Sequence, residues 1–312
     1  MNTFNSRRSK YLKFFALLGI IVTVSAWGAS FISTKVLMER GGFTPVQMYT
    51  YRFSAAYLLL LLYTCRKSLL SKNWRDELTF LLCGVCSGSL YFITENFALK
   101  HTTTGNVSLL ASISPIFTTI LMGVFYRMRI GSGVILGSVT AFIGVGFIVF
   151  SGGEGMEIHP AGDLLALSAA LSWGIYTIAV KRLLPIYNSF FITRKLFFYG
   201  SLTSLPLLFA AGAPYHLDTL VNLSHPEFLL NFLFLVLMCS VMAYLLWNES
   251  IKILGAVTAN NFLYGQPLVT MVAAAIILNE PFTLLGGIGC ALIVGGLVIS
   301  DKYPELRIKR MA

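Results

Sequence analysis

The chain has 312 residues, of which 56% are apolar and only 12% are charged, and its formal net charge is +10. Soluble domains carry about twice that charged fraction, because they need polar surface to cover a core, so the composition excludes an ordinary soluble domain. A basic balance can indicate nucleic-acid binding. Here most of the 23 Lys and Arg residues stand in short gaps between apolar runs. We therefore expect the lipid bilayer, and no nucleic acid, as a partner.

Apolar runs of ~20 residues recur along the chain, and a run of that length crosses the ~30 Å hydrocarbon layer as a helix. Because a bilayer offers no water to backbone groups, helices are expected for every run. The predicted membrane-spanning helices are 14–36, 45–64, 78–99, 103–125, 132–151, 161–181, 189–211, 228–250, 255–278 and 282–300. The predicted fold class is an all-α integral membrane protein with ten transmembrane helices.

The basic residues of the gaps fall mainly on alternate sides of the predicted helices. The tails 1–13 and 301–312 are rich in Lys and Arg, whereas the gaps 152–160 and 212–227 contain none. The positive-inside rule therefore predicts a multi-pass protein of the cytoplasmic (inner) membrane with both termini in the cytoplasm, which requires an even number of helices. Arg194, Lys195 and Glu249 lie near the predicted cytoplasmic interface, where long charged side chains are expected to snorkel into water.

The two halves of the chain share spaced residues, which indicates an internal repeat. Trp27-Gly28 and Trp173-Gly174 each stand in the first predicted helix of a half. Five residues of the first half, Asn96, Lys100, Pro115, Gly137 and Gly144, recur 152 positions later as Asn248, Lys252, Pro267, Gly289 and Gly296. We predict repeats at 14–151 and 161–300. Since each repeat has an odd number of helices, the second must be inverted, which is a signature of secondary transporters.

These residues resemble the drug/metabolite transporter superfamily, in particular its duplicated EamA-type members. The resemblance rests on Trp-Gly followed by Lys35 or Lys181, on Glu95-Asn96-Phe97-Ala98-Leu99-Lys100, on the two midspan prolines, and on Leu278-Asn279-Glu280-Pro281-Phe282. The family usually shows a Glu at the position of Met128, so this chain departs from the family pattern there. The resemblance implies a ten-helix exporter or exchanger of amino acids, related metabolites or drugs in a cytoplasmic membrane.

Polar and aromatic side chains at middle depths are the candidate substrate-binding residues, since polar groups in a bilayer are expensive without a role. The candidates are Trp27, Arg52, Tyr91, Glu95, Asn96, Asn106, Ser112, Trp173, Tyr244, Asn248, Asn260, Tyr264 and Gln266. Pro115 and Pro267 each remove a backbone hydrogen bond and are expected to kink a polar helix in each repeat. The alternative interpretation is structural: Asn and Ser bond across helices, and aromatic rings pack.

Two charged candidates are predicted to pair. Arg52 lies ~10 Å from the outer end of its helix by helix rise, and Glu95 lies in the outer half of the next one. Such a pair could close an outer gate, bind a substrate carboxylate through Arg52, carry a proton on Glu95, or serve only as a static structural contact.

No enzyme, cofactor or metal site is predicted. The four histidines lack metal-ligand spacing, Cys83 and Cys86 form a single CxxC without histidine, and no GxxxxGK[ST] phosphate loop occurs. We predict a secondary transporter that exports amino acids or related small metabolites by alternating access, with protons as a candidate coupling ion. The alternatives are an importer or exchanger of another small metabolite or drug, a receptor, or a membrane-embedded enzyme. The sequence leaves substrate, coupling ion, direction and oligomeric state open.

Overall fold

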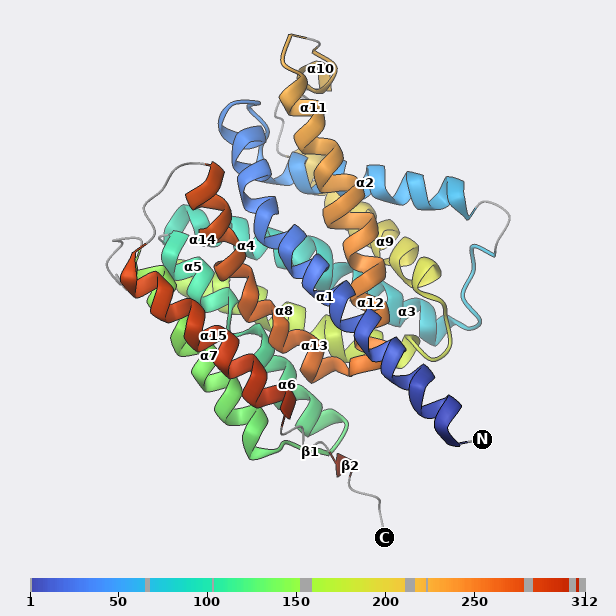
Figure 1. Cartoon of the computed structure of the whole chain (residues 1–312). Helices are drawn as coiled ribbons and strands as arrows, with labels where there is room; N and C mark the ends of the chain where they lie inside the picture. The colour runs from blue at the N-terminus through green and yellow to red at the C-terminus, as the bar shows by residue number, and fades with distance from the viewer. Residues whose placement is uncertain are drawn as a thin grey trace.

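The computed structural model describes residues 2–64, 68–102, 104–151, 159–210, 217–222, 224–277, 283–302 and 307–308, and within them the chain is almost entirely helical. Figure 1 shows the helices packed side by side as one bundle. The start of α1 and the end of α15 lie toward the same end of this bundle, at the bottom of the view.

The first half of the chain begins with a long helix and ends with another apolar one. Its elements are α1 (Asn2–Glu39), α2 (Pro45–Tyr63), α3 (Trp74–Gly84), the π-helical segment η1 (Val85–Ser89), α4 (Leu90–His101), α5 (Thr104–Ala111), α6 (Ser114–Phe125), the short strand β1 (Met128–Arg129) and α7 (Ser132–Ser151). Local sequence explains the start of α2. The backbone N–H of Gln47 donates to Thr44 Oγ1 at 3.3 Å, the Thr44 N–H donates to Gln47 Oε1 at 2.8 Å, and Pro45 opens the helix.

The second half repeats this order with more interruptions. Its elements are α8 (Pro160–Leu183), α9 (Ser189–Ala210), α10 (Leu217–Leu220), α11 (Pro226–Leu233), the π-helical segment η2 (Phe234–Met242), α12 (Ala243–Leu254), α13 (Ala256–Asn261), the 3-10 turn η3 (Phe262–Tyr264), α14 (Gly265–Ile277), α15 (Leu284–Lys302) and β2 (Arg307–Ile308), which pairs antiparallel with β1. Gly255 joins α12 to α13 with a φ of 90°, a conformation that favours glycine.

Each of the ten predicted segments coincides with one helix or with consecutive helical elements. Five of them are long and apolar enough to cross a membrane by length and composition: Lys10–Glu39, Trp74–Ala98, Ser132–Ser151, Pro160–Leu183 and Pro226–Leu254. Leu109–Phe125 and Leu284–Ser300 are shorter apolar helices. The helical fold class is therefore confirmed, and the number of membrane crossings remains a prediction.

Both polar helices are interrupted just before their prolines. α5 ends at Ala111 and α6 begins at Ser114, so Pro115 lies in the first turn of α6. In the second half, η3 separates α13 from α14, and Pro267 lies in the first turn of α14. The first turn of a helix tolerates proline because the N–H that proline lacks has no partner there. Each predicted segment is thus two helices in sequence.

Four glycines bring α7 and α15 into backbone contact, and the two helices lie side by side (Figure 1). A Cβ added to Gly137 would lie 2.5 Å from the carbonyl oxygen of Gly296, and one added to Gly144 would lie 2.6 Å from that of Gly289. Gly296 and Gly289 face Gly137 and Gly144 just as closely in return. Because Gly137 meets the later glycine of α15 and Gly144 the earlier one, the two helices run antiparallel. Small residues permit such close approach between helices.

This contact predicts that a substitution at Gly296 affects stability more than the same substitution at its neighbour Gly295. We expect Gly296→Ala to lower the stability of the purified protein by about 1–3 kcal/mol, because the new methyl group meets backbone atoms of Gly137 and Ala141. Gly295→Ala, with nothing within 4 Å of the added Cβ, should leave stability within about 1 kcal/mol of the parent value. Thermal unfolding in detergent measures both. Equal effects of the two substitutions would show that the helices do not meet at this face.

Candidate functional site

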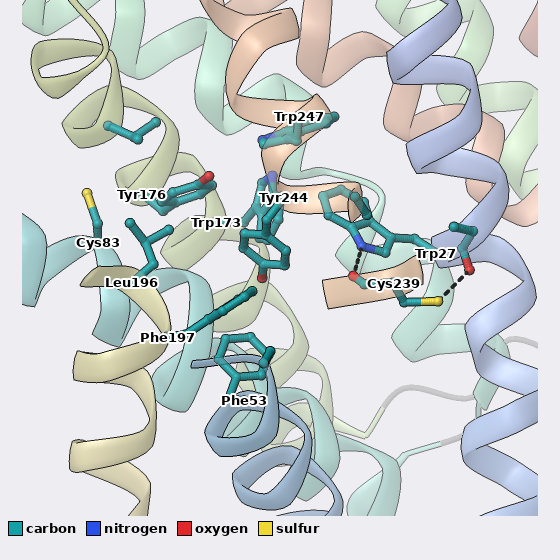
Figure 2. Close-up of a cluster of buried hydrophobic side chains, with 14 of the residues drawn as sticks. Trp27, Phe53, Cys83, Trp173, Tyr176, Leu196, Phe197, Cys239, Tyr244 and Trp247 are labelled. Atoms are coloured by element: carbon teal, nitrogen blue, oxygen red, sulfur yellow. Dashed lines mark hydrogen bonds between the residues drawn. The ribbon is translucent and has the colours of Figure 1, made fainter. Parts of the chain in front are cut away.

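A group of buried aromatic rings lies where the two halves of the chain meet (Figure 2). The ring centroid of Trp27 lies 5.4 Å from that of Trp173 and 5.1 Å from that of Trp247. Tyr244 completes this central aromatic cluster at 5.6 Å from Trp27. All four rings are buried, while Tyr91, which contacts Trp173 at 5.6 Å, is partly exposed. The cluster therefore packs α1, α8 and α12 together, with Tyr91 of α4 at its edge.

The carbonyl group of Cys239 links the cluster to a charged residue. Within η2, the Ala243 N–H donates to the carbonyls of Met238 and Ser240, so the Cys239 carbonyl lacks its ordinary α-helical donor. Trp27 Nε1 donates to this carbonyl at 2.8 Å, as Figure 2 shows, and Arg52 Nη2 donates to it at 3.0 Å. Two helices of the first half are thus bound to one buried carbonyl of the second half.

The other π-helical segment makes corresponding contacts in the opposite direction. Ser172 Oγ of α8 donates to the carbonyl of Cys86 at 2.7 Å, and Tyr244 Oη donates to that of Ser87 at 3.0 Å. Within η1, Gly88 has φ −127° and ψ −105°, which departs from helical geometry. Each half therefore offers carbonyls of a distorted helix to side chains of the other half.

Arg52 lies deep in the bundle, with 7% of its surface exposed. Its Nε donates to Ser240 Oγ at 2.6 Å, in addition to the bond from Nη2 to Cys239. The guanidinium carbon lies 6.0 Å from the ring centroid of Phe53 and 5.9 Å from that of Phe92. These contacts fix the side chain between α2, α4 and η2.

Glu95 and its neighbours are more accessible. Tyr91 Oη donates to Glu95 Oε1 at 2.9 Å, and Tyr91, Glu95 and Asn96 are all partly exposed on α4. The expected ion pair is not formed: within the described part of the chain Arg52 bonds to η2, and Glu95 to the tyrosine one turn before it on its own helix. In this conformation the hydroxyl of Ser240 and the carbonyl of Cys239 are the acceptors within hydrogen-bond distance of Arg52, and the Glu95 carboxylate accepts from Tyr91 through one oxygen.

Two predicted asparagines are buried cross-links. Asn248 accepts from Tyr176 Oη and donates to Thr193 Oγ1, both at 3.1 Å, and it is fully buried. Asn260 accepts from Trp173 Nε1 at 3.1 Å and donates to the Ala256 carbonyl at 3.0 Å. Since both amides bond to protein groups on each side, they join helices in this conformation, as the structural alternative predicted.

The remaining candidates lie along the two interrupted helices. Ser112 stands in the turn between α5 and α6, and Gln266 in the first turn of α14; both are partly exposed. Tyr264 is fully buried in η3, away from the central aromatic cluster, in a separate apolar group with residues of α7 and α15. Asn106 belongs to α5, and its side chain lies outside the described residues. The structure therefore does not gather all predicted residues at one point.

Sequence reasoning missed the roles of Cys239 and Ser240. The available signal was a Cys-Ser pair followed by Tyr, which occurs in both halves as Cys86 with Tyr91 and Cys239 with Tyr244. An apolar run looks the same in an α-helix and in a π-helical turn, so the carbonyls that lack their ordinary α-helical donor could not be predicted. Among the described residues, no group of three or more His, Cys, Asp and Glu could hold a metal ion.

A second charged cluster joins α3 to α8 and α9 at one end of the bundle. Its main bond is the ion pair between Lys195 Nζ and Glu77 Oε1, at 2.5 Å, and Tyr199 Oη donates to the same carboxylate. Asp76 accepts from Tyr187 Oη at 2.8 Å. Partial burial, together with this carboxylate, raises the pKa of Tyr187, so its hydroxyl stays a neutral donor.

The expectation that Arg194 and Lys195 snorkel is wrong, since their exposed fractions are 2% and 7%. Arg194 donates to Thr64 Oγ1 at 2.7 Å and to the Ser68 carbonyl at 2.6 Å. Arg194 thus has acceptors in Thr64 and Ser68, and Lys195 has one in Glu77 of α3. These acceptors inside the protein make burial of both cations possible. Glu249 is partly exposed and accepts from Ser189 Oγ at 2.6 Å.

Removing one partner of the Lys195–Glu77 pair should destabilise the protein more than removing both. We expect Glu77→Gln or Lys195→Met to lower stability by about 1–3 kcal/mol, because the first leaves the buried Lys195 ammonium and the second the half-buried Glu77 carboxylate without its partner. The double substitution should lose less than the two single losses together. The matched control is Arg40→Gln, which breaks the exposed Arg40–Glu227 pair and should change stability by less than about 1 kcal/mol. Additive losses in a double-mutant cycle would contradict the prediction.

Apolar helices in two matched halves, with polar groups buried where the halves meet, define a multi-pass membrane transport protein. The chain belongs to the EamA-like transporter family, whose sequence profile matches residues 14–150 and again 160–300. The expected resemblance to the drug/metabolite transporters is confirmed by these two matches.

Similar proteins carry transporter names. An uncharacterized transporter of Archaeoglobus fulgidus is 28% identical over 90% of this chain and 96% of its own length. A probable terminal-alkyne amino-acid exporter of Streptantibioticus cattleyicolor is 26% identical over 92% of this chain and 93% of its own length. A solved structure with 17% identity superposes with a TM-score of 0.74 over 91% of this chain and 96% of that one, which shows the fold.

Proposed function

We propose that the chain is a secondary transporter of ten membrane-spanning helices arranged as two inverted repeats, 14–151 and 161–300. The reciprocal glycine contacts of α7 and α15 carry this proposal. Equivalent helices that pack antiparallel through equivalent residues are what a two-fold rotation about an axis in the membrane plane produces. Such a pair of repeats has two related conformations, one open to each side of the membrane, and alternation between them moves a substrate across.

The moving parts are the interrupted helices. The π-helical segments η1 and η2 and the breaks before Pro115 and Pro267 are places where backbone bonds can change without unwinding a regular helix. All of these elements lie in α3–α6 of the first half and α11–α14 of the second. The contacts exchanged between the halves at Cys86 and Cys239 tie them to α8, α1 and α2. Rocking of one half against the other would exchange these contacts.

The substrate site lies between the halves, beside the central aromatic cluster. Its accessible members are Tyr91, Glu95, Asn96, Ser112 and Gln266, which are partly exposed. The buried members, Trp27, Arg52, Trp173, Tyr244, Asn248, Asn260 and Tyr264, are proposed to meet the substrate as the halves rock, and Asn106 completes the set from α5. Glu95, which is partly exposed beside the bilayer-embedded core, is the candidate proton carrier.

Export of amino acids or related small metabolites across the cytoplasmic membrane is the function that these features support best. The similarity to a probable terminal-alkyne amino-acid exporter supports both the class of substrate and the direction. Aromatic rings around buried polar groups suit a small molecule with an apolar body and polar ends. An importer or an exchanger would use the same geometry.

Transport is tested with purified protein in liposomes. We expect the wild-type chain to move at least one of a panel of labelled amino acids and related metabolites, and Glu95→Gln to reduce the response to a pH gradient because the carboxylate no longer takes up a proton. Empty liposomes are the control. If no compound moves with or without a pH gradient, the receptor and enzyme interpretations replace this one.

The orientation is tested with alkaline phosphatase fusions in cells. Because basic residues remain in the cytoplasm, we expect fusions after Tyr187 and Lys302 to be inactive and a fusion after Asn222 to be active. Fusion levels on immunoblots control for expression. Activity of the Lys302 fusion would place the C-terminus outside and rule out ten crossings with a cytoplasmic N-terminus.

A further inference from the structure

Arg52 is a buried cation that forms no direct ion pair among the described residues, and the Glu95 carboxylate lies within electrostatic range of it. Only 7% of the surface of Arg52 is exposed, and within the described part of the chain no carboxylate lies within ion-pair distance of it. Its two bonds go to a neutral hydroxyl and a neutral carbonyl of η2. A guanidinium that has only neutral hydrogen-bond acceptors is expensive in a bilayer-embedded bundle, and such residues commonly face cavities or ligands.

The guanidinium retains a donor for a further group. The bonds to Ser240 and Cys239 use Nε and Nη2, and Nη1 donates to no atom of the described residues. Because Nε and Nη2 are held, the plane of the guanidinium is fixed and a bound anion would meet it in a defined orientation. Arginine at such a site favours planar acceptors, of which a carboxylate is the commonest in small metabolites.

The surroundings of Arg52 connect it to accessible residues. Its guanidinium carbon lies 5.9 Å from the centroid of Phe92, whose ring lies 5.2 Å from that of Tyr91. Tyr91 is partly exposed and binds the partly exposed Glu95. On the other side, Phe53 contacts both the guanidinium and Tyr244 of the central aromatic cluster. An anion at Arg52 would therefore have aromatic rings around its apolar part.

We infer that Arg52 binds the carboxylate of the transported molecule, and that transport therefore selects small carboxylates with an apolar or aromatic body. The inference rests on the proposed transport function and names the substrate class of the same site. The bonds that Arg52 donates to η2 hold it against the second half, so a carboxylate bound there would lie between the two halves. A substrate that bridges the halves can favour one of their arrangements, which alternating access requires.

The experiment compares each carboxylate with its amide. Amino acids and simple carboxylic acids, including L-phenylalanine and L-leucine, are tested beside L-phenylalaninamide, L-leucinamide and the other matched amides. Two readouts are measured on the same protein: the shift of the thermal unfolding temperature in detergent, which reports binding, and counterflow in liposomes, which reports transport. The variants are Arg52→Gln and Arg52→Lys, with Arg40→Gln as the matched control at an exposed arginine.

We expect wild type and Arg40→Gln to prefer at least one carboxylate over its amide by roughly 10- to 100-fold in apparent affinity, as expected for a charge-assisted hydrogen bond. Arg52→Gln should lose that preference, and Arg52→Lys should keep only part of it, because it retains the charge without the planar fork. Size-exclusion chromatography identifies a variant that fails to fold, and the comparison of acid with amide on wild type then decides alone.

Each other outcome has a definite meaning. If wild type moves compounds but treats acids and amides alike, Arg52 is a structural cross-link and this inference is overturned while the transport function stands. If acids stabilise wild type but not Arg52→Gln and nothing moves in liposomes, the binding site stands and the transport function falls. If no carboxylate binds or moves, the inference is overturned.

Discussion

The hydrogen bonds to the carbonyl of Cys239 hold the two halves of this molecule together at their centre. A regular α-helix would occupy that carbonyl with its own backbone, whereas the π-helical turn of η2 leaves it facing Trp27 and Arg52. A buried carbonyl without a backbone donor needs another donor, and here side chains of the first half supply it to the distorted helix of the second half. The packing of the central aromatic cluster follows from where these donors are held.

The two halves use the same device with different partners. Cys86 and Ser87 of η1 accept from hydroxyl groups of Ser172 and Tyr244, whereas Cys239 of η2 accepts from an indole and a guanidinium. The repeat is thus preserved in the backbone and varied in the side chains. The charge of Arg52 is on one side of the interface.

The ion pairs at the ends of the bundle differ in how far water reaches them, and a charge interaction is weaker where water surrounds it. The Lys195 side chain is 8% exposed and its partner Glu77 also accepts from Tyr199, whereas the Arg40 side chain is 63% exposed. Water screens the Arg40–Glu227 pair. The Lys195–Glu77 pair depends on hydrogen bonds from neighbouring side chains to offset the cost of removing its charges from water. Arg194 strengthens the buried end through bonds to the segment between α2 and α3.

The amino-acid sequence determined the class of the molecule, because hydrophobic length and the placement of charges act residue by residue. The spacing of residues predicted the apolar runs and the repeated glycines Gly137 and Gly289. It also predicted the two prolines, and the helices break just before each of them. What the sequence left open was the partner of each polar group. Arg52 and Glu95 looked like a pair because both are charged and lie at similar depth, but the tertiary structure gave each a nearer partner. Asn248 and Asn260 are polar and central, and they cross-link helices because a hydroxyl group and an indole N–H of α8 lie within hydrogen-bond distance of them. Depth in a membrane follows from counting residues along one helix, whereas hydrogen-bond partners depend on the rotation and packing of several helices, which only the folded chain decides.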